Sequence, residues 1–97
     1  MKNDERYIYI LYDELGRIKF GITNNFARRI NQISSASGLK IQKYYTEACS
    51  SARRIEQKLL EYFNAYRIDG TEWIVAGFEF FDVVNLTRKI IKEADDP

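Results

Sequence analysis

Apolar residues occupy every second position in two short runs near the start of the chain. These residues are Ile8, Ile10, Ile18, Phe20 and Ile22. A period of two is typical of β-strands that bury one face. Between the runs, the sequence DELG supplies the aspartate and glycine that a short turn needs. We therefore predict a β-hairpin over residues 7–23.

The second face of this hairpin is more polar, since it carries Tyr9, Lys19 and Gly21. A shift of the strands by one residue would turn the isoleucines to the wrong side, so the apolar pattern restricts the register. Every register that keeps the isoleucines together places Tyr9 opposite or diagonal to Lys19. We therefore expect a phenol and an ammonium group to be neighbours.

A helix of about three turns follows the hairpin. Asn24 and Asn25 are candidate N-caps, and Gly38 is suited to end the helix. Arg29 flanks the apolar stripe, whereas Arg28 points away from it. The stripe consists of Phe26, Ile30 and Ile33. Arg29 is either a functional side chain or an arginine that extends its charged end past a packed edge.

A strand is predicted over residues 39–48, and the strongest helical pattern of the chain follows over residues 50–66. Glu56 falls inside the apolar stripe of that helix, and Glu61 lies on the opposite side. A carboxylate that faces the core is costly unless it is paired or bound to a cation. Glu56 is therefore either half of a salt bridge or a metal ligand. The stripe comprises Ala52, Ile55, Leu59, Leu60, Tyr62, Phe63 and Tyr66.

The last part of the chain begins with a glycine turn and a short extended piece around Trp73. We expect Glu72 to form a structural pair with a basic residue and Trp73 to belong to the core. A final helix is predicted through Phe81, Val84, Ile90 and Ile91.

Composition limits the class of protein. A chain of 97 residues supports one domain with a modest core. Cys49 has no second cysteine to pair with, which favours a reducing compartment. No run has the form of an export signal or the length of a membrane span. We expect a cytoplasmic protein without membrane contact, in the host cytoplasm if the protein is viral.

Charge is distributed unevenly, although the net charge is only +1. Residues 15–67 contain ten Lys or Arg and three acids, whereas residues 68–97 contain three and seven. The basic segment fits an anionic partner better than the net charge suggests, although from charge alone a mixed solvated surface is the favoured explanation. Candidate contacts to a nucleic-acid backbone are Arg17, Arg28, Lys40, Lys43, Arg53 and Arg54.

In order and spacing, the short motifs resemble those of the GIY-YIG nuclease domain, in a compact branch met in bacteriophages. The sequence YIY (residues 7–9) stands at the first motif and KFG (residues 19–21) at the second. The segment over residues 52–63 resembles the helix with the metal-binding glutamate. The sequence GTEWI (residues 70–74) is similar to a Glu-Trp-Phe motif. The resemblance covers about residues 6–91 and implies one domain (residues 1–97) of the α+β class, with a small antiparallel three-stranded sheet and about three helices.

The resemblance assigns catalysis to Tyr9, Lys19, Arg29 and Glu56. Lys19 replaces the tyrosine of the second motif, as is usual in this branch, and Tyr7 replaces the glycine of the first. Leu60 stands where this branch often has histidine, and the chain contains no histidine. A histidine base, which some relatives use, is therefore excluded.

The implied function is a metal-dependent endonuclease that hydrolyses DNA phosphodiester bonds with little intrinsic sequence specificity. Glu56 would bind Mg²⁺ or Mn²⁺, and Arg29 would pair with the scissile phosphate. Tyr9 would orient or deprotonate the attacking water. A free phenol titrates near about pH 10, and Lys19 together with the metal would favour the phenolate. Lys19 could instead contact phosphate directly.

Two other classes of protein remain open. One is a catalytically silent nucleic-acid-binding or protein-interaction module with the same fold, and the other is a structural assembly protein. The chain has no helix-turn-helix or zinc finger that would distinguish bases. Strict sequence specificity would therefore need a homodimer or a partner protein.

Overall fold

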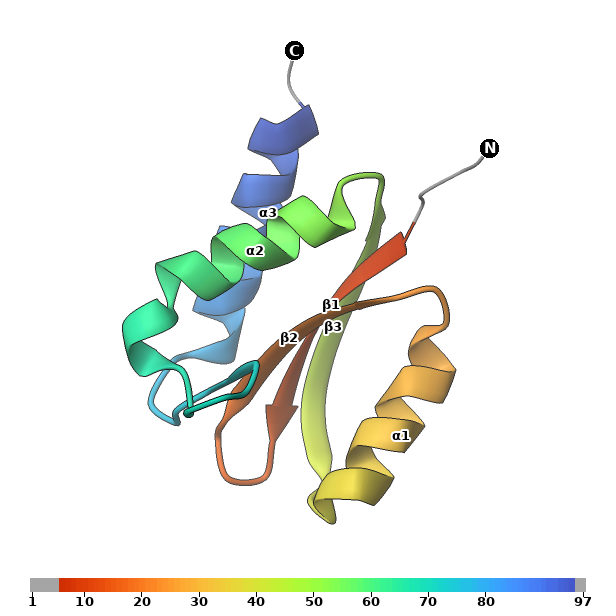
Figure 1. Ribbon diagram of the computed structural model, residues 1–97, viewed down its shortest axis with the longest axis vertical. Coiled ribbons are helices and arrows are strands. Elements are labelled where there is room, and N and C mark those ends of the chain that lie inside the picture. The colour runs from red at the N-terminus through yellow and green to blue at the C-terminus, as the bar shows by residue number, and fades with distance from the viewer. Residues whose placement is uncertain (1–5, 96–97) are drawn as a thin grey trace.

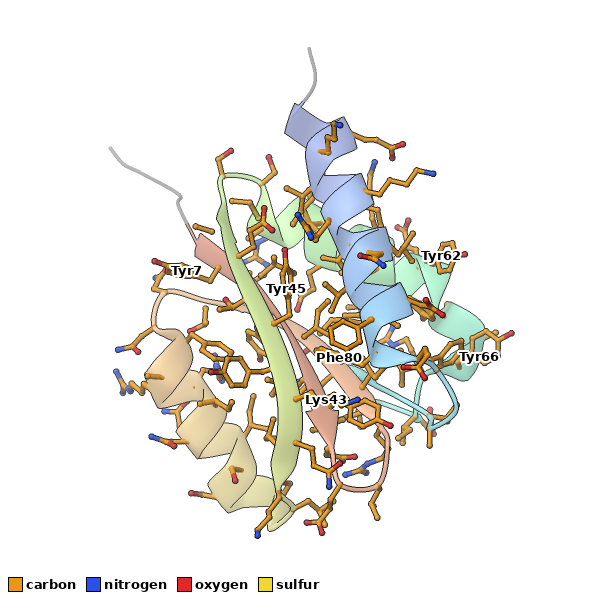
Figure 2. The ribbon with its side chains drawn as sticks, turned by 180° about the vertical axis from the view of Figure 1, so that it is seen from behind. Tyr7, Lys43, Tyr45, Tyr62, Tyr66 and Phe80 are labelled. Carbon is orange, nitrogen blue, oxygen red and sulfur yellow. The ribbon has the colours of Figure 1, made fainter. Side chains whose placement is uncertain are left out.

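The computed structural model describes residues 6–95, which form a four-stranded antiparallel sheet with helices on both faces (Figure 1). The strands are β1 (Arg6–Asp13), β2 (Ile18–Thr23), β3 (Ile41–Cys49) and β4 (Trp73–Ile74). The helices are α1 (Phe26–Ser37), α2 (Ala52–Tyr62) and α3 (Phe80–Asp95), with a short 3₁₀ helix at Asn64–Tyr66. The strand order is β3-β1-β2-β4. Helix α1 covers one face, and α2 and α3 cover the other (Figures 1 and 2).

The register of β1 and β2 confirms the predicted apolar face of the hairpin. Ile8 pairs with Ile22, and Ile10 pairs with Phe20. Ile8, Ile10 and Phe20 are fully buried and belong to one core with side chains of α2 and α3. Burial of these side chains provides most of the driving force for closing the helices onto this face.

The predicted three-stranded sheet was wrong by one strand. Strand β4 pairs antiparallel with β2, Ile74 opposite Ile18 and Trp73 opposite Lys19. Two residues are too few for an alternating pattern to identify a strand. Ile74 is buried, so β4 closes the core at the end of the sheet.

Helix α1 begins and ends as the sequence predicts. The side chain of Asn25 accepts a hydrogen bond from the N–H of Arg28 at 3.1 Å. Gly38 has a φ of 72°, a left-handed conformation that favours glycine at a helix end. Although Phe26, Ile30 and Ile33 form the expected stripe, none of the 12 side chains of α1 is buried. Helix α1 therefore packs on the sheet through side chains that stay partly exposed to solvent.

Helix α2 ends earlier than predicted, at Tyr62, and the 3₁₀ helix follows it. Tyr62 is 66% exposed and Tyr66 is 49% exposed, so assigning both to the buried stripe was wrong. Their rings pack edge-on against Phe63 and Phe78, with centroids 4.9 and 5.0 Å apart. They cover the outside of the core instead of filling it.

Asp13 organises the turn between β1 and β2. The side chain is fully buried, and Oδ1 accepts hydrogen bonds from the N–H groups of Leu15 and Arg17 at 3.0 and 2.9 Å. Oδ2 accepts a third bond from Nε of Arg17 at 2.8 Å. The carboxylate is thus satisfied by its own turn.

We expect Asp13→Ala to lower the free energy of unfolding by about 2–4 kcal/mol, because it leaves two amide groups and a guanidinium without their acceptor. Urea denaturation at neutral pH measures this change. Exposed Glu61 provides the control, since Glu61→Ala should change stability by less than about 0.5 kcal/mol. Equal stability of the two variants would contradict the structural role of Asp13.

Within residues 6–95, no helix combines the length and apolar character needed to cross a bilayer.

Candidate active site

The candidate site is centred on Tyr9, which lies across Gly21 of the neighbouring strand. The two residues pair in the β1 and β2 register. A Cβ atom at position 21 would overlap the phenol, so the ring occupies the space that a side chain would fill. The ring also contacts Phe26 of α1, with centroids 6.1 Å apart, and Tyr9 is only 3% exposed. Glycine is required here by the close approach of the ring.

Lys19 lies diagonal to Tyr9, as the sequence predicts, since Lys19 pairs with Leu11 and Gly21 pairs with Tyr9. The ammonium Nζ of Lys19 forms an ion pair with Oε1 of Glu72 at 3.0 Å. The expected pairing of Glu72 with a basic residue is therefore confirmed. Lys19 also lies beside the ring of Trp73, 5.9 Å from its centroid.

Glu56 extends from α2 toward the same place and meets a second carboxyl group. A hydrogen bond joins Glu56 to Glu72, and within residues 6–95 Glu56 forms no ion pair. Of the two explanations for this half-buried glutamate, the salt bridge is therefore not realised. Burial raises the pKa of Glu56, and the charge of Glu72 and their hydrogen bond raise it further. The cations of Lys19 and Arg53 oppose this rise.

Burial also raises the pKa of Tyr9, to about 12. The charge of Arg29 lowers this pKa, whereas Glu72 and Glu56 raise it. The causes of this shift do not include Lys19, and the expected effect of Lys19 together with a metal stays a prediction. The nearby cation that opposes burial is the guanidinium of Arg29.

These interactions bring together all four residues that the sequence predicts as catalytic. They come from β1 (Tyr9), β2 (Lys19), α1 (Arg29) and α2 (Glu56). Glu72, just before β4, is the additional member of the group. The sequence predicts that Glu72 pairs with a basic residue. Only the fold shows that it contacts both Lys19 and Glu56.

A polar recess of about 380 Å³ lies beside Arg29. It opens at the N-terminus of α1, where the helix dipole favours an anion. Its lining residues are Ile22, Thr23, Asn24, Asn25, Arg28, Arg29 and Gln32. Arg28 and Arg29 thus border the same recess, although only the charge of Arg29 acts on Tyr9.

The remaining basic residues do not form one surface around this site. Arg17 is paired with Asp13 at 2.8 Å and lies over Trp73, so its guanidinium supports the fold. Lys43 pairs with Tyr12 on the face of the sheet opposite to Tyr9, with Nζ 5.0 Å from the ring centroid of Tyr12. The other candidates, all exposed, are Lys40, Arg53 and Arg54.

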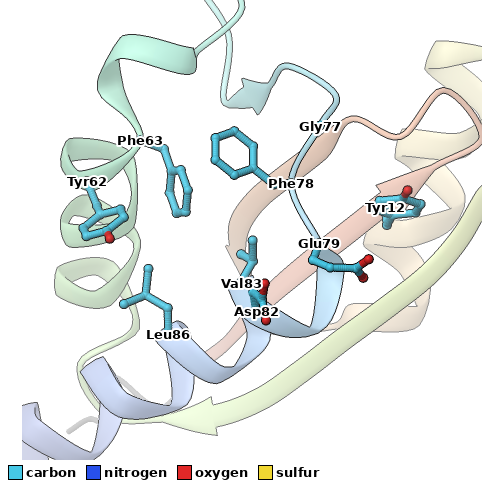
Figure 3. Close-up of a pocket in the computed structure, with 9 residues that line it drawn as sticks. All are labelled: Tyr12, Tyr62, Phe63, Gly77, Phe78, Glu79, Asp82, Val83 and Leu86. Atoms are coloured by element: carbon cyan, nitrogen blue, oxygen red, sulfur yellow. The ribbon is translucent and has the colours of Figure 1, made fainter.

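A larger pocket, of about 710 Å³, lies elsewhere, between α2 and the start of α3 (Figure 3). Aromatic rings such as Phe63 and Phe78 line it together with the carboxylates of Glu79 and Asp82. None of the four predicted catalytic residues borders it. Its acidic groups also disfavour binding of a phosphate.

The site suits a weakly held divalent cation. Within residues 6–95, no group of three or more His, Cys, Asp or Glu side chains could hold a metal ion. The two carboxyl groups of Glu56 and Glu72 nevertheless lie side by side and repel each other when ionised. Mg²⁺ is commonly bound by one or two carboxylates, with water and substrate phosphates as the other ligands. The residues present therefore fit such an ion.

The fold and the site define a small α+β domain with a polar centre assembled from the hairpin, two helices and the segment before β4. Residues 6–94 match the T5orf172 domain, and the chain belongs to this family. No curated protein and no solved structure matches the chain.

Glu56→Gln is expected to raise the melting temperature at pH 7 without divalent cations, by about 2–5 °C. Because the pKa of Glu56 is raised in the folded protein, the ionised carboxylate destabilises the fold above that pKa. An amide removes the repulsion and can still donate a hydrogen bond to Glu72. The gain should disappear as the pH falls below the unfolded-state pKa, where Glu56 is protonated in both states.

Thermal unfolding in EDTA at pH 7 and near about pH 4 measures this difference. Glu61→Gln, an exposed change on the same helix, is the matched control and should leave the melting temperature unchanged at both pH values. A lower melting temperature for Glu56→Gln at pH 7 would contradict the inferred repulsion.

Proposed function

We propose that this protein is a metal-dependent endonuclease of the GIY-YIG type that hydrolyses DNA phosphodiester bonds with little sequence specificity of its own. The observation that carries the proposal is the convergence of Tyr9, Lys19, Arg29 and Glu56 from four separate elements. The same four residues are singled out by motif spacing. Agreement between motif and geometry is the main support.

Arg29 binds the scissile phosphate in this proposal. The recess beside it is polar, and its guanidinium can donate two parallel hydrogen bonds to phosphate oxygens. Negative charge accumulates on these oxygens as the phosphodiester bond is attacked. A fixed donor that is already in place stabilises this charge without having to reorganise.

Tyr9 positions the attacking water. Since its pKa is about 12, the phenol is neutral at pH 7 and holds water through a hydrogen bond. Phenolate would form only if added positive charge outweighed the effect of burial and of the two glutamates. Glu56 and Glu72 are the residues that would hold Mg²⁺ or Mn²⁺, and the ion would supply such charge and neutralise part of the phosphate.

Lys19 contributes a second cation whose position is restricted by Glu72. The ion pair of 3.0 Å and the side chain's 14% exposure hold the ammonium at the site instead of letting it extend into solvent. From this place Lys19 can donate to a phosphate oxygen or to the departing oxygen. Contacts of Arg28 and Arg53 with the phosphate backbone of DNA would increase affinity without recognising bases.

Supercoiled plasmid incubated with the purified protein and Mg²⁺ or Mn²⁺ tests the proposal. Nicked and then linear DNA is expected, and EDTA should prevent both products. DNA binding without cleavage in either metal would instead indicate a catalytically silent module of the same fold. One observation favours that second candidate, because Tyr9 is only 3% exposed. Neither binding nor cleavage, together with stable oligomers, would indicate a structural assembly protein.

A further inference from the structure

Strand β3 forms one end of the sheet, and its outer edge has no partner strand within residues 6–95. It is nine residues long, and no helix crosses in front of it (Figure 2). Its outward N–H and C=O groups are therefore open to another strand. A long exposed edge of this kind is a template for pairing with a second chain.

Apolar surface continues from this edge onto α1. Tyr44 is 61% exposed although it contacts Phe26 of α1, with ring centroids 5.2 Å apart. Ile30 and Ile33 of α1 are only half-buried. The edge and the helix beside it therefore offer both unpaired backbone groups and incompletely covered side chains to a partner.

We propose that a second copy of this chain pairs with β3 in antiparallel orientation. The two-fold axis lies midway between Tyr45 and the partner's Tyr45. In this register Lys43 stands opposite the partner's Glu47, and Glu47 stands opposite the partner's Lys43. The two residues are four positions apart, about 13 Å along the strand, so they cannot pair within one chain. The edge is thus complementary in charge to itself.

The charges also select this register over its neighbours. Moving the two-fold axis to Tyr44 would put Lys43 opposite the partner's Tyr45, and moving it to Thr46 would put Lys43 opposite the partner's Cys49. Only the axis through Tyr45 joins opposite charges. Directly opposite charges stabilise strand pairs, whereas like charges destabilise them.

Both charged side chains are already held in place on the same face of β3. Nζ of Lys43 lies 5.0 Å from the ring centroid of Tyr12 and 5.8 Å from that of Phe81. Glu47 accepts a hydrogen bond from the hydroxyl of Tyr45. Since Tyr12 lies on the inner neighbour β1, Lys43 turns from this ring toward the open edge of β3 when it pairs with the partner's Glu47.

The pairing would join two four-stranded sheets into one and place Tyr44 opposite the partner's Thr46, on the face that carries α1. It does not depend on the proposed function. For the proposed nuclease, it would place both Tyr9 side chains on the same face, which suits a cut in each strand of a duplex.

Sedimentation equilibrium of the full chain tests the pairing. The protein is expected to dimerise at micromolar concentrations, and Lys43→Glu or Glu47→Lys alone should weaken dimerisation about 100-fold through like-charge contacts. An equimolar mixture of the two variants should dimerise again, because each acidic edge then meets a basic one. Lys58→Glu, an exposed change on α2, is the control and should leave dimerisation unchanged.

Thermal unfolding of each variant checks that it is folded, since Glu47→Lys also removes the hydrogen bond from Tyr45. The double variant Lys43→Glu/Glu47→Lys provides a second test, because it reverses both charges and should dimerise. A monomeric wild-type protein, dimeric single variants, or a mixture that stays monomeric would each overturn the proposal. These outcomes are read without DNA, so they are distinct from failure of the nuclease proposal.

Discussion

Arg29→Ala is expected to reduce the rate of plasmid nicking about 10³-fold, whereas Arg28→Ala should stay within about tenfold of the wild type. The two arginines are adjacent, exposed and border the same recess, so their general electrostatic contributions to DNA binding are matched. Only Arg29 is close enough to Tyr9 to lower its pKa. The difference in nicking rate between the two variants therefore measures the contact that Arg29 makes with the phosphate in the transition state.

Initial nicking rates at saturating plasmid provide the measurement, and fluorescence anisotropy of a labelled duplex in EDTA gives the binding of each variant. Both alanine variants should bind DNA with similar, slightly reduced affinity. Arg29→Lys should recover only part of the rate, because it keeps the charge and loses the planar fork. Equal losses of rate for Arg28→Ala and Arg29→Ala would contradict the assignment.

Gly21→Ala is expected to lower the free energy of unfolding by about 3 kcal/mol and to abolish cleavage. In most strands, replacing glycine by alanine is neutral or favourable, because glycine loses more conformational entropy on folding. Here the new Cβ would overlap the hydroxyl and the ring of Tyr9. The ring or the strand must move, and either movement displaces the phenol from Arg29 and Glu56.

A double-mutant cycle separates this overlap from a general weakening of the sheet. Removing the ring with Tyr9→Ala should make Gly21→Ala nearly harmless, so the double variant should be more stable than the sum of the single changes predicts, by about 2 kcal/mol. Tyr9→Phe should not relieve the overlap, because ring carbons take part in it as well as the hydroxyl. Urea denaturation measures all variants. Additive changes, or relief by Tyr9→Phe, would contradict the packing described.

The parts of the fold that follow from local order could be predicted from the sequence. The two faces of the hairpin, the Asn25 cap and the end of α1 at Gly38 all depend on neighbouring residues with a regular period. The position of Arg29, whose charge lowers the pKa of Tyr9, agrees with its predicted place beside the apolar stripe of the same helix. In each case the spacing of residues within a single element carries the information.

Which residues meet at the site depends on contacts between parts of the chain that are distant in sequence. Glu72 lies 53 residues from Lys19, and no period connects it with Lys19 or with Glu56. The sequence predicts that Glu56 faces the core but leaves open whether its neighbour is a cation or, as found, a second carboxyl group. Likewise, the sequence presents Arg17 as an exposed cation, whereas the fold places the buried carboxylate of Asp13 against it.

Periodicity thus predicted which face each residue occupies, because side-chain direction along a helix or strand depends only on local backbone geometry. It did not predict β4, the exposure of Tyr62, or the meeting of Glu56 with Glu72. Those features depend on how separate elements pack together, and packing is decided by long-range burial and charge. The tertiary structure alone therefore shows which charged groups share the environment of Tyr9.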